Sequence, residues 1–272
     1  MYDRRLAIES VTRVGPGQFV LGFESREIAA QCRPGHFVMI AVADSIDPLL
    51  RRPMAIYRVV RDDGGTAIGF TLLIEVVGRG TALLEQQDPG DHLDVLGPLG
   101  VPFDLPVAGP AGGEHLLVMG GVGAAPFPFV AEELLEAGHR VRAFVGARTS
   151  AALLCVDDFR ELGVPVEVAT DDGSDGFHGF VIGPLQKYLQ SEGYAGTTLY
   201  ACGPTPMMRA VHDIAVANDL PLQVSFEAPM ACGIGVCLSC VVRVHAVDGA
   251  GWRYARCCRE GPVFDSRRLV WE

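Results

Sequence analysis

The sequence predicts an antiparallel β-barrel, followed by a parallel α/β domain and a small cysteine-rich segment. Three observations support this. Short strand-like runs between turn residues fill positions 1–103, strand and helix patterns alternate over 104–226, and spaced cysteines occur in 227–272. Closely spaced short strands are typical of small barrels, whereas alternating strands and helices indicate a parallel sheet covered by helices. We therefore expect two domains and a C-terminal segment with these bounds.

The first part contains four runs rich in β-branched and aromatic residues. They are 18–23, 37–42, 56–60 and 70–77. Turn signals rich in Gly, Pro and Asp bound them, so each run is expected to be a short strand of the barrel.

Two segments of the barrel are candidate phosphate-binding sites. Arg52 precedes Pro53 between two expected strands, where we expect Pro53 to fix a turn and the arginine to grip a phosphate. Gly78 and Gly80 directly follow the fourth expected strand, and Thr81 can cap a helix that starts after it. The alternative for the first segment is a surface loop with solvated arginines, and the alternative for the second is an ordinary glycine-rich turn.

The second part alternates between strand and helix patterns. Strands are expected at 116–119, 141–145, 166–169, 198–201 and 223–226, and helices at 124–137, 181–190 and 206–217. This order predicts a parallel sheet with helices on its faces.

A glycine-rich turn follows the first strand of the α/β part and opens its first helix. It contains Gly120, Gly121 and Gly123. Such a turn can cradle a dinucleotide pyrophosphate at a helix N-terminus. The spacing departs from a strict G-x-G-x-x-G, so nucleotide binding and an ordinary tight turn both remain possible interpretations.

A second turn, Cys202-Gly203-Pro204, ends a later strand of the same sheet. Ligands of open α/β sheets bind at the carboxyl ends of strands. We expect Gly203 and Pro204 to fix this turn and Thr205 to cap the following helix. The alternative for Cys202 is a small buried residue without a binding role.

Four cysteines near the C-terminus follow the pattern C-x4-C-x2-C…C. They are Cys232, Cys237, Cys240 and Cys258. This is the plant-type spacing for a [2Fe–2S] cluster held by four thiolates, whereas zinc sites usually bring two close pairs of ligands. Cys257 adjoins Cys258, and in a strand-like segment neighbouring side chains point to opposite faces, so we expect only one of them to reach the metal.

Composition limits the classes of partner. The net charge of −11 argues against nucleic acid. No apolar run approaches the length of a membrane span, and the first residues lack a signal-peptide core. Thiolates persist in a reducing compartment, so we expect a cytoplasmic protein that binds neither nucleic acid nor membrane.

These pieces in this order resemble the ferredoxin reductase superfamily, in which a flavin-binding barrel precedes a nucleotide-binding α/β domain. The run Ala-Cys-Gly-Ile-Gly-Val-Cys-Leu-Ser-Cys and the Gly-Pro-Val-Phe sequence at 261–264 are similar to the electron-transfer subunits of class 1B dihydroorotate dehydrogenase. The resemblance covers essentially the whole chain.

The resemblance implies three groups of binding residues. The FAD site would contain Arg52, Pro53, Met54, Ala55, Gly78, Gly80 and Thr81. The NAD site would contain Gly120, Gly121, Gly123, Cys202, Gly203 and Pro204. The [2Fe–2S] ligands would be Cys232, Cys237, Cys240 and Cys258, with Cys257 normally not a ligand. Ala55 stands where the family usually has serine, so one hydroxyl contact near the flavin is in question.

The resemblance also implies a function in pyrimidine biosynthesis. A separate catalytic subunit would oxidise dihydroorotate at its FMN, and electrons would pass through the cluster to FAD and then to NAD+. The family forms a heterotetramer of two catalytic and two electron-transfer subunits, so the cluster segment is expected near the partner.

Other functions share parts of this pattern. One is the small subunit of a ferredoxin:NADP reductase or sulfide dehydrogenase complex, and another is a reductase that feeds an oxygenase. A regulatory nucleotide-binding module with structural zinc belongs to a different class. Arg148 and Ser150 could meet the 2′-phosphate of NADP, whereas Asp171 and Asp172 would disfavour it, and the family likeness favours NAD.

Overall fold

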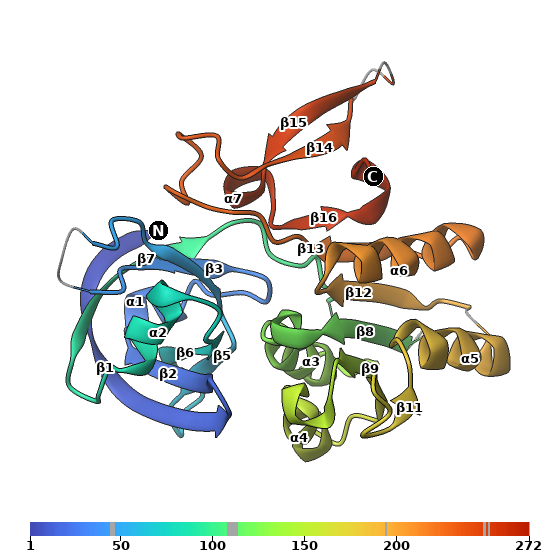
Figure 1. Ribbon diagram of the computed structural model, residues 1–272, viewed down its shortest axis with the longest axis horizontal. Coiled ribbons are helices and arrows are strands. Elements are labelled where there is room, and N and C mark those ends of the chain that lie inside the picture. Colours follow the sequence, from blue (N-terminus) through green and yellow to red (C-terminus); the bar gives the residue numbers. More distant parts are fainter. Residues whose placement is uncertain (44–46, 108–113, 194, 247–248, 250, 272) are drawn as a thin grey trace.

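The computed structural model describes residues 1–43, 47–107, 114–193, 195–246, 249 and 251–271. Three regions are visible in Figure 1: a curled sheet, a sheet covered by helices, and a hairpin region beside both. The predicted fold class, a barrel-like antiparallel sheet followed by a parallel α/β sheet, is confirmed.

The N-terminal sheet has seven antiparallel strands in the order β4-β3-β7-β1-β2-β6-β5. These are β1 (Tyr2–Gly15), β2 (Gln18–Glu24), β3 (Phe37–Ile40), β4 (Arg52–Ala55), β5 (Arg58–Arg61), β6 (Ala67–Glu75) and β7 (His92–Leu99). Only Ile56 and Tyr57 separate the edge strands β4 and β5, so the sheet curls into a half-barrel. Two short helices belong to the same domain: α1 (Arg26–Ala29) between β2 and β3, and α2 (Arg79–Glu85) between β6 and β7.

Three strands of this sheet were not expected: β1, β7 and the edge strand β4. Most side chains of β1 are exposed or half-buried, so it lacks a clear apolar pattern. β7 alternates between buried and less buried positions, but its sequence contains Gly97 and Pro98, which read as turn residues. In β1 and β7 the pairing partners on the neighbouring strands, rather than local composition, maintain the extended conformation.

The expected turn at Pro53 is wrong, because Arg52–Ala55 forms strand β4. β4 pairs only with β3 and lies at the edge of the sheet. A proline is tolerated there, since an edge strand has one side without ladder hydrogen bonds.

The second sheet has the order β11-β10-β9-β8-β12-β13-β16. Its strands are β8 (Glu114–Gly120), β9 (Arg140–Ala147), β10 (Val166–Thr170), β11 (Phe177–His178), β12 (Thr198–Cys202), β13 (Leu222–Ser225) and β16 (Val263–Asp265). All neighbouring pairs are parallel except β13 with β16.

Helices cover both faces of this sheet. They are α3 (Phe127–Glu136), α4 (Val156–Glu161), α5 (Ile182–Glu192) and α6 (Thr205–Ala217), with short 3-10 turns η1 (Gly121–Ala124) and η2 (Ser150–Ala152). Alternate residues of β8 serve the two faces: Leu116 and Val118 pack with α5 and α6, whereas Leu117 and Met119 pack with α3 and α4. The helix expected at 124–137 is shorter, because η1 precedes α3.

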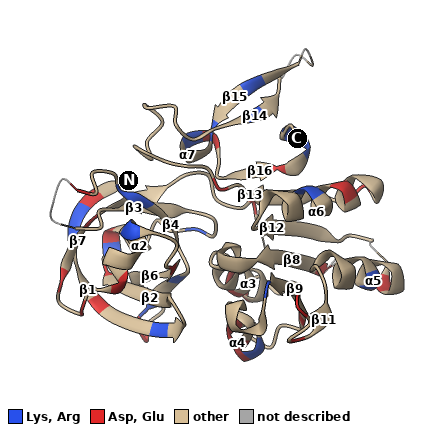
Figure 2. Ribbon diagram, viewed as in Figure 1, with Lys and Arg blue, Asp and Glu red and all other residues tan. Residues whose placement is uncertain are grey.

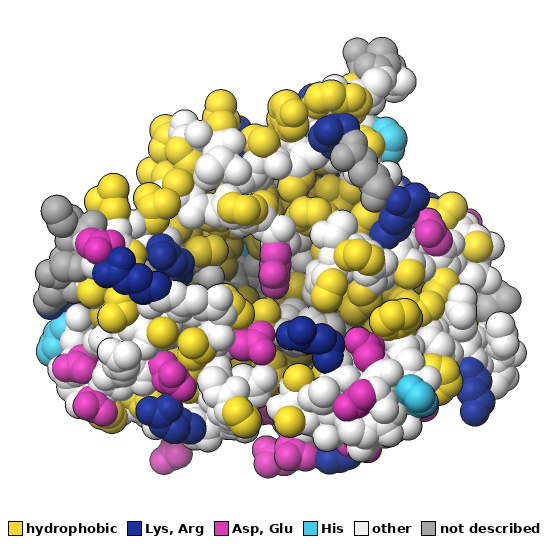
Figure 3. All heavy atoms as spheres, in the orientation of Figure 1, with side chains coloured by type: hydrophobic (Ala, Val, Ile, Leu, Met, Phe, Trp, Pro, Cys, Tyr) yellow, Lys and Arg dark blue, Asp and Glu magenta, His cyan; other side chains and the backbone are white. Residues whose placement is uncertain are grey.

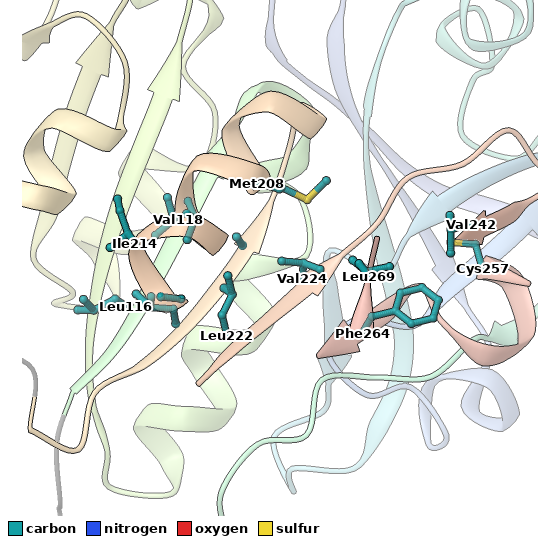
Figure 4. Packing of buried hydrophobic residues seen from close by; sticks show 14 of the residues in the cluster. Leu116, Val118, Met208, Ile214, Leu222, Val224, Val242, Cys257, Phe264 and Leu269 are labelled. Atoms are coloured by element: carbon teal, nitrogen blue, oxygen red, sulfur yellow. The ribbon is translucent and has the colours of Figure 1, made fainter. Parts of the chain in front are cut away.

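The C-terminal region is joined to the α/β sheet. It contains the hairpin β14 (Val241–His245) and β15 (Trp252–Arg256), helix α7 (Cys257–Glu260), β16 and the turn η3 (Ser266–Arg268). β16 adds an antiparallel edge strand to β13. Phe264, Leu269 and Cys257 of this region belong to the same buried cluster as Val224 and Leu222 (Figure 4).

Among the described residues, none of the helices combines the length and the apolar composition needed to cross a lipid bilayer.

Candidate functional site

Two adjoining cavities lie where the half-barrel meets the α/β sheet. The first, of about 750 Å³, lies at the carboxyl ends of the parallel strands. The second, of about 520 Å³, lies between β4, β6 and the segment that follows β13. Glu75, Val122 and Glu227 line both, so the cavities share one wall.

The first cavity brings together the two predicted turns of the α/β domain. Gly120, Gly121 and Gly123 line it with Gly203 and Pro204. A Cβ atom on Gly123 would lie 2.6 Å from the backbone carbonyl of Cys202. Only glycine at this position allows η1 to pack directly against the turn that follows β12.

Helix α6 begins at this cavity. Pro204 is its N-cap, and Thr205 and Pro206 line the cavity. The expected capping by Thr205 is wrong, because Thr205 is the first helical residue and no side chain caps this end. Unpaired backbone N–H groups at a helix start favour an anionic ligand.

The second cavity contains most of the predicted flavin residues. Arg52, Pro53, Met54, Ala55 and Thr81 line it. The predicted nucleotide residue Cys202 lines this cavity rather than the first, and its buried thiol has a pKa raised by burial.

Gly78, Gly80 and Thr81 hold helix α2 close to Arg52. A Cβ atom on Gly80 would lie 2.6 Å from the Arg52 Nε atom, so a larger residue at this position would displace the Arg52 guanidinium. The hydroxyl of Thr81 accepts from the N–H groups of Val77 at 2.9 Å and Gly78 at 3.2 Å. Thr81 therefore stabilises the helix start from within α2, which begins at Arg79, rather than preceding the helix as expected. Gly78 and Gly80 themselves are not among the lining residues of either cavity.

Sequence reasoning missed the two carboxylates in the shared wall. Glu75 is the last residue of β6, and Glu227 follows β13 in the segment that leads to the cysteines. Burial raises the pKa of Glu227, and the neighbouring Glu75 raises it further. Each glutamate stands at or just after the end of a strand, and this position was the only signal in the sequence. The two strands belong to different sheets, so the sequence did not indicate that the carboxylates share one wall.

The four predicted cluster ligands lie in two pairs. The thiols of Cys232 and Cys237 are close enough to interact, as are those of Cys240 and Cys258. The Ser239 hydroxyl, 3.2 Å from the Cys237 Sγ atom, is the main cause that lowers the pKa of that exposed thiol to about 6. A [2Fe–2S] cluster takes two thiolates on each iron, so this set of donors fits it. Among the described residues, no three His, Cys, Asp or Glu side chains lie close enough together to bind a single metal ion.

Cys257 and Cys258 differ in their surroundings. The Cys257 thiol is fully buried and donates to the Phe226 carbonyl at 3.0 Å. The backbone N–H of Cys258 points to the Cys240 Sγ atom at 3.4 Å. The two cysteines begin helix α7, so the expectation of a strand-like segment is wrong. They still face different neighbours, because successive residues of a helix point in different directions.

The cysteine loop packs directly on the half-barrel. A Cβ atom on Gly233 would lie 2.4 Å from the Cγ atom of Met39 in β3, and Gly233 has φ +71. Met230, two residues before Cys232, lines the second cavity, as does Phe226. The cysteine loop is thus adjacent to the second cavity.

Two family models match the chain. The iron-sulfur cluster binding domain of dihydroorotate dehydrogenase B matches residues 227–270, and the oxidoreductase NAD-binding domain matches residues 117–213.

Curated relatives match almost the entire chain. The electron transfer subunit of dihydroorotate dehydrogenase B (NAD(+)) from Desulforamulus reducens is 39% identical over 97% of this chain and 96% of that protein. The subunit of the same name from Bacillus caldolyticus is 37% identical over 98% of both chains. The chain belongs to this family. Members of the electron transfer subunit family are oxidoreductase components, which agrees with the two cavities and the cysteine loop.

Solved structures share the fold. One is the structure of an NADH-dependent reduced ferredoxin–NADP oxidoreductase, which was solved for insight into flavin-based electron bifurcation. A chain of that structure is 30% identical to this protein and superposes on it with a TM-score of 0.82. That likeness covers 98% of this chain and 90% of the other. Phthalate dioxygenase reductase shares the fold at a TM-score of 0.62 and 16% identity, over 98% of this chain and 96% of that one.

Proposed function

We propose that this chain carries electrons from a catalytic dihydroorotate dehydrogenase subunit to NAD+. The observation that supports this most directly is the continuous arrangement of the cysteine loop, the second cavity and the first cavity. The loop adjoins the second cavity through Met230 and Phe226, and the two cavities share Glu75, Val122 and Glu227. Groups held in these three places would be neighbours, as electron transfer requires.

Each place suits one group. Arg52 offers a guanidinium for the FAD pyrophosphate, and Ala55 lines the same cavity without a hydroxyl. The turns at Gly120–Gly123 and Gly203–Pro204, with the start of α6, suit the NAD phosphates. Cys232, Cys237, Cys240 and Cys258 would hold the [2Fe–2S] cluster. When bound, the cluster supplies single-electron transfer and FAD converts single electrons into a hydride for NAD+.

We infer NAD rather than NADP from the family likeness, and Asp171 supports this choice. Asp171 and Arg148 both line the first cavity. A carboxylate can accept a hydrogen bond from the ribose 2′-hydroxyl of NAD, whereas it would repel the 2′-phosphate of NADP. Arg148 would then stack on the nucleotide or pair with its phosphates.

The catalytic partner would bind at the cysteine segment. Val236 is 72% exposed, Leu238 60% and Tyr254 57%. Hydrophobic side chains gather over this region in the upper part of Figure 3. Exposed apolar patches mark protein interfaces, so we place the catalytic subunit here. The family resemblance implies that this partner contains FMN and that two copies of each subunit form a heterotetramer. Free thiols fit a cytoplasmic location.

Spectroscopy and co-purification test this proposal together. The purified chain should contain one FAD, two irons and two sulfides, and NADH should bleach the flavin. Protein purified from its native host should bring with it an FMN subunit that oxidises dihydroorotate. A colourless protein with one zinc would contradict the electron-transfer function.

The likeness to the ferredoxin–NADP oxidoreductase chain supports a second candidate function, as a small subunit of a bifurcating complex. The partner distinguishes the two. Recovery of a large flavoprotein that reduces NADP+ with ferredoxin, without dihydroorotate oxidation, would favour the second candidate.

A further inference from the structure

An ion network adjoins the cysteine loop. Glu260 of α7 accepts from Arg253 at 2.8 Å and from the Arg256 Nε atom at 3.3 Å. A third bond, from the Arg256 backbone N–H to Glu260 at 3.1 Å, fixes the carboxylate. The arginine positions of β15 and α7 are blue in Figure 2. Two arginines and one glutamate leave a net charge of +1 in this network.

Arg256 connects this network to the loop between the first two cysteines. Its Nη1 atom donates to the backbone carbonyl of Gly235 at 3.1 Å. Gly235 has φ +88, and its own backbone N–H points to the Cys258 thiol. Arg256 therefore holds a loop residue that also contacts a ligand from the other end of the segment.

The position of Arg256 in the sequence adds to this role. It directly precedes Cys257 and Cys258 and is the N-cap of α7. One side chain thus ties the Cys232–Cys237 loop to the helix that carries Cys258. The Arg256 side chain is 40% exposed. If its bonds to Glu260 were removed, the side chain would be free to rotate into solvent.

We propose that Arg256 is a positioning residue that fixes the geometry of the [2Fe–2S] cluster loop and raises the reduction potential of the cluster, with Glu260 holding it in place. This rests on the proposed function, because it requires a bound cluster. Reduction adds a negative charge, so a fixed positive charge nearby stabilises the reduced form. Hydrogen bonds and net charge around the sulfurs are known determinants of such potentials.

The test is a redox titration of the purified FAD-containing protein, followed by the electron paramagnetic resonance signal of the reduced cluster. Arg256→Gln should lower the cluster potential enough to change the ratio of oxidised to reduced cluster at least tenfold at fixed potential, which is about 59 mV for one electron. The electron paramagnetic resonance signal of this variant should also broaden, because the cysteine loop is no longer held in one position.

Arg259→Gln is the matched control. Arg259 lies on the same helix, carries the same charge, and its Cβ and Cγ atoms lie beside Gly235. Its side chain is exposed, so solvent screens its charge, and it makes no hydrogen bond to the loop among the described contacts. We expect less than a threefold change in the ratio and an unchanged line shape. If Arg256→Gln shifts the ratio no more than this control and leaves the line shape unchanged, the proposal is overturned.

Glu260→Gln separates positioning from charge alone. Loss of a negative charge would by itself raise the potential and leave the signal sharp. We expect instead a broadened signal and a potential no higher than that of the unaltered protein, because Arg256 is released. If Arg256→Gln does not assemble the cluster, Arg256→Lys serves in its place, and it should broaden the signal since lysine lacks the two-nitrogen fork.

The outcomes distinguish the two proposals. A missing cluster signal in the unaltered protein would contradict the proposed function. A normal signal that responds equally to Arg256→Gln and Arg259→Gln would contradict only the role of Arg256.

Discussion

At the scale of single residues, two adjacent cysteines lie in different surroundings. Cys257 is enclosed and its thiol donates to the Phe226 carbonyl, whereas Cys258 lies beside Cys240. Sequence spacing placed both within reach of a cluster. Their neighbours support the assignment of Cys258 as the ligand and of Cys257 as a buried donor.

We predict that Cys258→Ser loses the cluster, whereas Cys257→Ser keeps it. A serine at 257 can still donate to the Phe226 carbonyl, but a serine at 258 removes a thiolate. Iron content and visible absorption of the two purified variants measure this. The reverse result would show that Cys257 is the fourth ligand.

A second residue-scale prediction concerns His115, which is buried beside Tyr200 and His139. Its Nδ1 atom lies 3.2 Å from the Tyr200 hydroxyl, and the rings of His115 and His139 are 4.9 Å apart. Burial lowers the pKa of His115 to about 4, with His139 as the next cause. The unfolded chain therefore binds a proton more readily than the folded one, and stability is lost as pH falls from about 6.5 towards 4.

His115→Gln should remove this part of the pH dependence. Between about pH 7.5 and 5.5 the unaltered protein should lose ~1.3 kcal/mol of unfolding free energy through this histidine. The midpoint of urea unfolding at the two pH values measures the loss in each protein. An equal loss in the variant would show that His115 does not titrate as described.

At the scale of elements, the cysteine loop depends on its contact with β3. Gly233 allows the loop to approach Met39 closely, because it has no Cβ atom. For the same reason it adopts its positive φ without backbone strain. The edge strand β4 illustrates a similar dependence, since Pro53 fits where a single neighbour pairs with it.

We predict that Gly233→Ala disrupts the cysteine loop, and that Gly65→Ala is a suitable control. Both glycines have positive φ, +71 and +77, but a Cβ atom on Gly65 meets nothing within 4 Å. The control should cost about 1 kcal/mol of unfolding free energy from backbone strain alone. Gly233→Ala should cost more and also reduce iron content. Equal losses with full iron in both would contradict this role of the β3 contact.

At the scale of the whole molecule, an ion network joins the half-barrel to the α/β domain. Arg58 of β5 pairs with Glu132 of α3 at 2.8 Å and with Asp158 of α4 at 3.0 Å. The Tyr57 hydroxyl donates to Asp158 at 2.5 Å. None of these four residues lines either cavity, so the network acts on the contact between the two domains.

We predict that Arg58→Met destabilises the protein by ~2 to 3 kcal/mol, since it leaves two half-buried carboxylates without their cation. Arg61→Met is the control, because its pair with Glu133 is longer, at 3.7 Å, and more exposed. The control should cost less than about 0.5 kcal/mol. Urea unfolding followed by circular dichroism measures both, and similar losses would show that the network does not join the domains.

Much of the fold followed from local patterns. The strands at 116–119 and 141–145 and the helix at 206–217 lie within or overlap the observed elements, because buried strands and amphipathic helices leave a regular apolar pattern. β1 and β7 were missed because their stability comes from pairing with distant strands. Thr205 was misplaced by one position, a boundary that local sequence specifies weakly.

Sequence motifs alone indicate which groups the site can hold. Cysteine spacing indicated an iron-sulfur cluster and the glycine turns indicated bound phosphates, whereas the flavin was implied by the resemblance that the order of the motifs carries. How these binding places adjoin became apparent from the packing of the folded chain. Glu75 and Glu227 meet because two separate sheets pack together, and Arg256 reaches Gly235 because a hairpin folds back over the cysteine loop. Contacts between distant segments depend on the packing of the entire chain, which no local pattern specifies.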